Sequence, residues 1–116
     1  MTRICVYVAG AYDGPDVCTV LRHMRWGLRV ATHLLKLGYA PFAPWLDFQF
    51  GLTEEVSREE MLAYSMAWLE KADVMFVVIE GVKESLGTQA EIARAEELGI
   101  PIVWTVDELR ERFPVS

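Results

Sequence analysis

Short apolar runs alternate along the chain with longer stretches in which apolar residues recur every three or four positions. The runs have the composition of strands that are buried on both faces, whereas the spaced stretches are typical of amphipathic helices. The pattern predicts strands at 4–9, 40–43, 74–79 and 102–104 and helices at 17–37, 57–72, 88–98 and 106–112. Because strands and helices alternate, we expect right-handed crossovers and a parallel sheet of four or five strands. The predicted fold class is α/β, a three-layer flavodoxin-like or Rossmann-like domain.

Local signals indicate where these helices begin and end. Gly38 follows the first helix and supplies the residue type that commonly ends one. Ser57 and Glu60, three residues apart, predict a capping box for the second helix. Thr88 and Glu91 have the same spacing and predict a capping box for the third helix. The apolar face of the first helix is predicted to hold Val17, Leu21, Met24, Leu28, Ala31 and Leu35.

Length and charge narrow the class of protein. The 116 residues suit one domain that spans 1–116 and has a single core. The net charge of −6 comes without a basic stripe that could neutralise a phosphate backbone, so a nucleic-acid polymer is not an expected partner. A small anionic ligand stays open, because a helix N-terminus can bind one without net positive charge.

The two cysteines and the N-terminus bear on the compartment. Cys5 and Cys18 lack metal-ligand spacing and are expected to be reduced thiols, one in a core strand and one near a helix start. The N-terminal apolar run is too short for a signal peptide, and no stretch approaches the ~20 apolar residues of a membrane span. We therefore expect a cytoplasmic protein without a membrane partner.

The sheet topology predicts where a ligand binds. In an open parallel sheet the ligand lies beyond the carboxyl ends of the strands, which here are followed by loops 10–16, 44–56 and 80–88. The first loop lacks the glycine spacing of a dinucleotide-binding fingerprint, and the chain has no phosphate-binding P-loop. His23 and His33 lie ten residues apart on one helix and are expected at the surface. No cofactor and no metal ion is predicted.

Glu91 has two interpretations at this stage. Its spacing from Thr88 favours a carboxylate that caps a helix. The same position near a helix start would also keep the carboxylate ionised and oriented, and an ionised carboxylate beyond a strand end can act as a nucleophile. Spacing alone favours the cap, and the two roles do not exclude each other.

Four short motifs occur in order along most of the chain. They are Val-Tyr-Val-Ala-Gly at 6–10, Gly-Tyr-Ala-Pro-Phe-Ala-Pro at 38–44, Trp-Leu-x-x-Ala-Asp at 68–73 and Ser-Leu-Gly-x-x-x-Glu at 85–91. Together they resemble the nucleoside 2-deoxyribosyltransferase superfamily, which includes nucleotide N-hydrolase relatives and short phage and bacterial members. The resemblance implies cleavage or transfer at the N-glycosidic bond of a (deoxy)nucleoside or nucleoside monophosphate.

The resemblance also implies roles for individual residues. Glu91 matches the glutamate that attacks the anomeric carbon, and Tyr7 matches the first-strand tyrosine whose hydroxyl holds it. Gly10 matches a glycine of the first loop at the ligand. Ser85 and Gly87 match the loop that contacts the sugar or its 5′ group. A carboxylate beside an oxocarbenium-like centre would give covalent and electrostatic stabilisation.

The sequence departs from the superfamily pattern in two places. Ser65 stands where the family usually has an aspartate beside the nucleophile, and Asp47 is a candidate substitute. Ala11 and Asp13 stand where the nucleotide hydrolases carry a serine and an arginine for the 5′-phosphate. An acidic residue beside a phosphate dianion is unfavourable, so an unphosphorylated nucleoside is favoured. Arg22, Arg25 and Arg94 are the alternative sources of positive charge.

Aromatic residues of the second loop and the small size of the domain complete the prediction. Trp45, Phe48 and Phe50 have two open interpretations: stacking on a base, or packing at an interface or lid. Trp26 and Trp68 lie among helical apolar positions and are expected to pack. In the resembling family a neighbouring subunit closes the site, which implies a homodimer or higher even oligomer. The alternative function is a non-catalytic nucleoside- or nucleotide-binding protein that keeps the fold without turnover.

Overall fold

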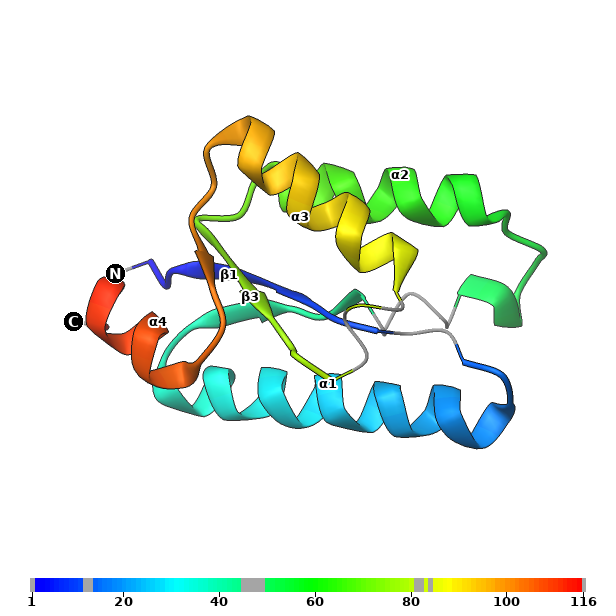
Figure 1. The fold of residues 1–116 in the computed structure, drawn as a ribbon, viewed down its shortest axis with the longest axis horizontal. Coiled ribbons are helices and arrows are strands. Elements are labelled where there is room, and N and C mark those ends of the chain that lie inside the picture. The colour runs from blue at the N-terminus through cyan, green and yellow to red at the C-terminus, as the bar shows by residue number, and fades with distance from the viewer. Residues whose placement is uncertain (1, 12–13, 45–49, 81–82, 84, 116) are drawn as a thin grey trace.

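The computed structural model describes residues 2–115 apart from 12–13, 45–49, 81–82 and 84. The predicted alternation of strands and helices is confirmed in this part of the chain (Figure 1). In chain order the elements are β1 (Cys5–Ala9), α1 (Val17–Leu37), β2 (Ala40–Phe42), α2 (Arg58–Leu69), β3 (Val74–Val77), α3 (Leu86–Leu98), β4 (Ile102–Val103) and α4 (Val106–Arg112).

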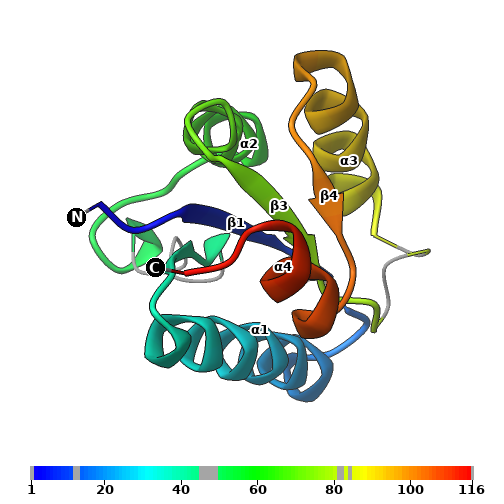
Figure 2. The ribbon, with the colours of Figure 1, turned by 90° about the vertical axis from the view of Figure 1, so that its left-hand side faces the viewer.

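The described strands form one four-stranded parallel sheet in the order β2-β1-β3-β4. Helices α1 and α4 cover one face of the sheet, and α2 and α3 cover the other (Figure 2). The domain therefore has the three layers of a flavodoxin-like α/β fold, as predicted. Strand β1 lies between β2 and β3, and its residues after Cys5 are all buried.

Alternation along β1 decides which side chains reach each helical layer. Val6 and Val8 belong to the core beneath α1 and α4, whereas Tyr7 and Ala9 belong to the core beneath α2 and α3. Successive residues of a strand point to opposite faces of a sheet, which accounts for this division. Tyr7 is therefore directed toward the layer that contains Glu91.

Asp73 joins the starts of two neighbouring strands. Its carboxylate Oδ2 accepts a hydrogen bond of 2.8 Å from the backbone N–H of Cys5, and its own N–H donates to the Cys5 carbonyl at 2.9 Å. These two bonds fix β3 against β1 ahead of the first paired residues. Asp73 thus has a structural role at the amino ends of the strands, whereas the predicted ligand loops follow their carboxyl ends.

The buried face of α1 differs from the predicted one. Its buried residues are Gly27, Ala31 and Leu34, so only Ala31 of the predicted stripe is buried and Met24 is half-buried. Leu34 is fully buried on this face, and Met24, Val30 and Leu37 pack beside it against the core. The other four members of the predicted stripe are exposed: Val17, Leu21, Leu28 and Leu35.

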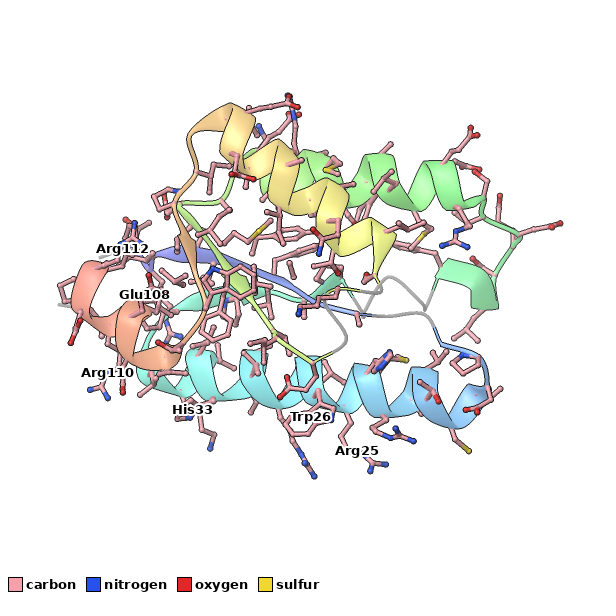
Figure 3. All side chains as sticks on the ribbon, viewed as in Figure 1. Arg25, Trp26, His33, Glu108, Arg110 and Arg112 are labelled. Carbon is pink, nitrogen blue, oxygen red and sulfur yellow. The ribbon has the colours of Figure 1, made fainter. Side chains whose placement is uncertain are left out.

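Several smaller predictions are corrected and two are confirmed. The side chain of Cys5 is exposed although it lies in β1. Trp26 does not pack in the core, because 40% of it is exposed and it points outward from α1 (Figure 3). Helix α2 ends at Leu69 instead of continuing to Ala72, and its predicted capping box between Ser57 and Glu60 is confirmed. His33 is exposed as predicted, but His23 is half-buried.

Two features are absent from the part of the chain that the structure describes. No helix in this part of the chain combines the length and the apolar character that crossing a membrane requires. The described His, Cys, Asp and Glu side chains form no group of three or more that is placed to hold a metal ion.

Gly38 ends α1 in a conformation that favours glycine. Its φ of 107° lies in the left-handed region, and its N–H donates to the carbonyls of Leu34 and Leu35. A Cβ at this position would lie 3.2 Å from Cγ1 of Val115. The left-handed backbone therefore favours glycine, and an added Cβ would also be tight against Val115.

We expect Gly38→Ala to lower the free energy of unfolding by about 1–2 kcal/mol, because a non-glycine residue is strained in the left-handed region. Thermal or urea unfolding measures the change. Gly51→Ala is the matched control, since a Cβ there has no heavy atom within 4 Å and the residue is exposed. Equal stability of the two variants would contradict the assignment of strain to Gly38.

Tyr39 predicts a dependence of stability on alkaline pH. Its side chain is fully buried and its hydroxyl donates to the Phe113 carbonyl at 2.7 Å. Burial raises the pKa of Tyr39, and the charge of Arg110 opposes this in part. The folded state then keeps the proton at a pH where the unfolded chain releases it, so stability is present below the ordinary pKa of 10.0 and declines as pH rises above it. Urea unfolding between pH 9 and 11, roughly, should show a steeper decline for the wild type than for Tyr39→Phe; equal slopes would contradict the prediction.

Candidate active site

The third helix begins earlier than predicted, which changes the role of Glu91. Helix α3 starts at Leu86 and Ser85 is its N-cap. The Ser85 hydroxyl accepts a hydrogen bond of 3.2 Å from the N–H of Thr88 and lies 2.7 Å from the Thr88 hydroxyl. The predicted capping box between Thr88 and Glu91 is therefore wrong. Thr88 is the third residue of the helix, and Glu91 lies beyond the first turn.

Glu91 is a buried carboxylate whose contact comes from a distant part of the chain. Only 7% of the residue is exposed. The Tyr7 hydroxyl of β1 donates a hydrogen bond to its Oε2 atom. The two residues are 84 positions apart, and the sheet and α3 bring them together. Burying a carboxylate is unfavourable unless hydrogen bonds stabilise its charge, so the Tyr7 hydroxyl both orients Glu91 and offsets part of that cost.

Tyr7 itself is held rigidly. It is fully buried in the central region of the sheet, and its ring stacks on Phe42 of β2 with centroids 5.6 Å apart. Met75 of β3 lies opposite Tyr7 in the pairing of β1 with β3. A side chain packed on several sides has little rotamer freedom, so the position of its hydroxyl, and with it that of Glu91, is fixed by the core.

An aromatic cluster extends from Tyr7 toward the surface of α2. Phe42 stacks on Trp68 at 5.3 Å between centroids, and Tyr64 contacts both rings. Phe50 meets Tyr64 edge-on at 5.3 Å. The sequence prediction of packing for Trp68 holds in part, because 47% of it remains exposed. Phe42 and Tyr64 were not predicted as site neighbours. The i, i+4 spacing of Tyr64 and Trp68 was the available signal, since such residues share one face of a helix.

Ser65, the residue in place of the family aspartate, lies on the buried side of α2. It is 7% exposed, and α2 packs beside α3 above the same face of the sheet (Figure 2). A serine in this position adds no charge to the layer that contains the Glu91 carboxylate. The layer therefore differs electrostatically from one that holds two carboxylates, in which ionisation of one disfavours ionisation of the other.

The remaining predicted ligand residues that the structure describes follow the carboxyl end of β1 or lie at the start of α3. Gly10 is half-buried and Ala11 is buried directly after β1. The hydroxyl of Ser85 is used as a helix cap. Gly87 is exposed, and a Cβ there would meet no heavy atom within 4 Å. Four residues named from the sequence lie outside the described residues: Asp13, Trp45, Asp47 and Phe48.

Two of the arginines that were candidates for binding a 5′-phosphate are directed away from Glu91. Arg94 of α3 donates to Glu70 at 3.1 Å and to Glu97 at 3.0 Å. The hydrogen bond to Glu70, followed by that to Glu97, raises the pKa of the Arg94 guanidinium. Arg25 points outward from α1 on the opposite face of the sheet (Figure 3). Neither cation is directed at Glu91.

The N-terminus of α1, which follows the first loop, carries the carboxylate of Asp16. Asp16 is the N-cap of α1 and accepts a hydrogen bond of 2.7 Å from the N–H of Thr19. This hydrogen bond is the main cause that lowers the pKa of Asp16, with Arg22 contributing through its charge. Asp16 already fills the capping position that a bound anion would use. The start of α1 is therefore a poor phosphate site.

Comparison with known proteins places the chain in one family. Residues 4–105 match the family described as a domain of unknown function (DUF7768), and because this span covers most of the 116 residues, the chain belongs to that family. No curated protein matches the chain significantly.

Proposed function

We propose that this DUF7768 domain cleaves or transfers at the N-glycosidic bond of a (deoxy)nucleoside or nucleoside monophosphate, with Glu91 as nucleophile. The observation that carries the proposal is the hydrogen bond from the Tyr7 hydroxyl to the buried Glu91 carboxylate. The resemblance to nucleoside 2-deoxyribosyltransferases implies this same pair of residues. A helix cap needs neither burial nor a distant tyrosine, so the arrangement favours a chemical role.

In the proposed reaction the Glu91 carboxylate is first the nucleophile and then the leaving group. An oxygen of Glu91 attacks C1′ of the sugar, the C1′–N bond breaks, and the base leaves with the bonding electrons and takes up a proton from solvent water. The resulting glycosyl ester is then attacked by water, which yields the free sugar and restores the carboxylate, or by a second base, which yields a new nucleoside. The Tyr7 hydroxyl keeps the carboxylate oriented through both steps.

Charge favours an unphosphorylated nucleoside among the substrates of this class. Arg94 is engaged by Glu70 and Glu97, and Arg25 lies on the other face of the sheet. The sequence has Asp13 and Ala11 where phosphate-binding relatives carry an arginine and a serine. A dianionic 5′-phosphate gains little in such surroundings, because its desolvation is not offset by a cation.

Ser65 favours the alternative function, a nucleoside-binding protein without turnover. The superfamily usually has an aspartate at this position, and the buried hydroxyl of Ser65 cannot supply its charge. One experiment separates the two functions: the full chain is incubated with a panel of deoxynucleosides, ribonucleosides and their monophosphates, and free base is measured by liquid chromatography. We expect base release, greater from nucleosides than from monophosphates. Measurable binding to a panel member without base release would overturn the enzyme proposal and support the alternative.

We further propose a cytoplasmic location and assembly as a homodimer or a higher even oligomer. The site layer is formed by one small domain, and a neighbouring copy would shield it from water, which strengthens the electrostatic interactions within it. Sedimentation velocity across a range of protein concentrations tests the assembly. A monomer at every concentration that supports base release would contradict it.

Gly87→Ala should separate stability from function. Gly87 lies in the first turn of α3 with open space at its Cβ position, so alanine is expected to raise the free energy of unfolding by about 0.5–1 kcal/mol. If Gly87 contacts the sugar as the resemblance implies, the added methyl group should nevertheless raise KM for base release. Ala93→Gly, an exposed change in the same helix, is the control for stability alone. An unchanged KM would remove Gly87 from the site.

A further inference from the structure

The exposed side of α1 repeats every seven residues. Leu21, Leu28 and Leu35 recur at this interval and are 52%, 36% and 51% exposed. Each leucine is followed by a cation, at Arg22, Arg29 and Lys36. Seven residues are close to two turns of helix, so the leucines form one column and the cations form a second column beside it.

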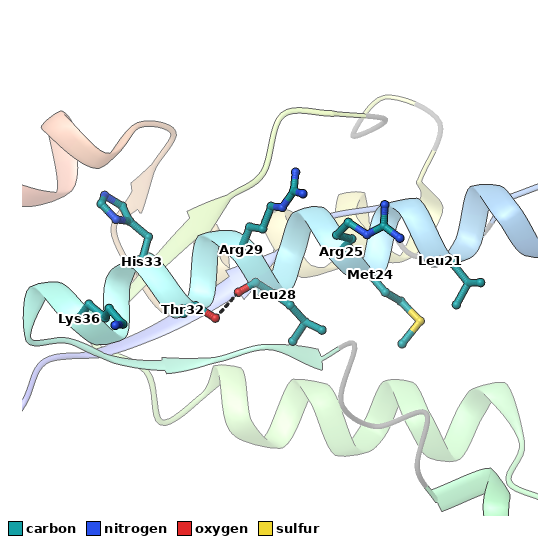
Figure 4. A pocket seen from close by; sticks show the side chains of 8 residues that line it. All are labelled: Leu21, Met24, Arg25, Leu28, Arg29, Thr32, His33 and Lys36. Atoms are coloured by element: carbon teal, nitrogen blue, oxygen red, sulfur yellow. Dashed lines mark hydrogen bonds between the residues drawn. The ribbon is translucent and has the colours of Figure 1, made fainter.

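A shallow groove along α1 is lined by Leu21 and Leu28 of the first column and by Arg29 and Lys36 of the second. Figure 4 shows Leu21, Met24 and Leu28 pointing to one side of the helix and Arg25 and Arg29 pointing to the other. The groove is lined further by Thr32 and His33. It lies on the face of the sheet opposite Tyr7 and Glu91, so it is separate from the candidate active site.

Charge on α1 is opposite to that of the chain. The helix contains four arginine or lysine residues and no aspartate or glutamate, whereas the whole chain has a net charge of −6. Within the part of the chain that the structure describes, Arg25, Arg29 and Lys36 form no ion pair. These cations are therefore available to an acidic partner.

The shape of the apolar surface favours a helix as that partner. Val17, Leu21, Leu28 and Leu35 lie within about 40° of one another around the helix axis, at 100° per residue. A column repeated every seven residues can form one side of the seam between two packed helices. Met24 and Ala31, which lie between its members in the sequence, pack against the core and are not part of the exposed column. A helix that lies in a membrane surface usually presents a wider apolar face, so a narrow column fits a second helix better than a lipid surface.

The charge pattern also disfavours the simplest pairing of two copies of this chain. In a twofold antiparallel pair of α1 helices, each flank of the seam meets the same flank of the other copy. Arg25 and Arg29 of one copy would then face cations of the second copy, which is unfavourable. The opposite flank of the seam is not available, because Gly27 and Leu34 face the core.

We propose that the outer face of α1 is a docking site for an acidic amphipathic helix of another protein. The leucine column contacts the apolar stripe of the partner, and Arg25, Arg29 and Lys36 pair with carboxylates that flank that stripe. Helix-in-groove recognition of this kind uses apolar anchors for affinity and flanking charges for orientation. The proposal is independent of the function proposed for Glu91.

A synthetic peptide of three heptads tests the proposal. The acidic probe carries leucines at alternating spacings of four and three with flanking glutamates, and the control probe carries lysines in place of the glutamates. Fluorescence anisotropy with the full chain should show at least about tenfold tighter binding of the acidic probe, weakened by salt. Leu21→Glu with Leu28→Glu should abolish this binding, whereas Leu62→Glu, on exposed α2 surface, should leave it unchanged.

Exchange of charge provides the decisive comparison. The variant with Arg25→Glu, Arg29→Glu and Lys36→Glu should lose the acidic probe and gain the lysine probe, with an unchanged circular dichroism spectrum. Equal binding of both probes, or binding of neither, would overturn the proposal. It would also be overturned if vesicles with anionic lipid bound the chain through α1 while the acidic probe did not. A third contrary result would be that the leucine variants only convert an oligomer of the chain to a monomer, without any change in probe binding.

Discussion

Replacing Glu91 with glutamine is expected to lower the rate of base release at least about 10³-fold while the protein stays folded. The amide has the shape of the carboxylate and can accept the hydrogen bond from the Tyr7 hydroxyl. It lacks the negative charge that forms the bond to the sugar. Loss of the nucleophile therefore removes the covalent route without leaving a cavity at a position that is 7% exposed.

The same substitution predicts little loss of stability. A neutral amide avoids the cost of burying a carboxylate, so Glu91→Gln should unfold at the same or a higher urea concentration than the wild type. Glu91→Ala is the contrasting variant, because it removes a buried side chain and should be less stable. Chromatographic assay of free base and urea unfolding are measured on the same preparations. A glutamine variant with wild-type base release would show that Glu91 is not the nucleophile.

Tyr7→Phe is expected to reduce base release by about 10- to 100-fold, the loss that corresponds to a hydrogen bond of about 1.5–3 kcal/mol to a charged group. The phenylalanine ring can keep the stacking on Phe42 at 5.6 Å and the packing within the core. What is lost is the hydroxyl that donates to Glu91. The carboxylate becomes less well oriented and less stabilised as an anion.

A shift in pH dependence distinguishes this role from a general weakening of the fold. Without the donor, the Glu91 carboxylate should hold its proton to a higher pH, so the acidic limb of the rate profile should move to higher pH in Tyr7→Phe. Tyr64→Phe is the matched control, because Tyr64 belongs to the same aromatic cluster and makes ring contacts with Phe42 and Trp68. An identical profile for wild type and Tyr7→Phe would contradict the positioning role of the hydroxyl.

Local periodicity was sufficient for the order and type of the elements. The bounds of α1 and α4 agree with those predicted from spacing, and Gly38 ends α1 as its residue type indicated. The capping box at Ser57 and Glu60 was also predictable, since all of its atoms lie within one turn. These features depend on contacts between residues that are close in sequence, so the residue types within a short window are sufficient to predict them.

The N-cap of α3 shows where this local information ends. Ser85 and Thr88 are both suitable caps, and the glutamate three residues after Thr88 favoured the later one. In the structure Ser85 caps the helix, Thr88 is buried in its first turn, and Glu91 meets Tyr7 instead. The competing partner of Glu91 is 84 residues away, so no window of the sequence could show that the carboxylate was committed elsewhere.

The orientation of α1 was likewise decided by tertiary packing. The helix has two apolar faces: the leucine column, and the face of Gly27, Ala31 and Leu34. Both faces satisfy the helical period, and hydrophobicity favoured the leucines. The inward face also packs Met24, Val30 and Leu37 against the core beside Leu34, so it buries more apolar side chains in close contact than the leucine column would. The sequence alone therefore determined which segments are strands and helices, and the family resemblance paired Tyr7 with Glu91. Only the tertiary structure brought these two residues into contact and turned the leucines of α1 outward.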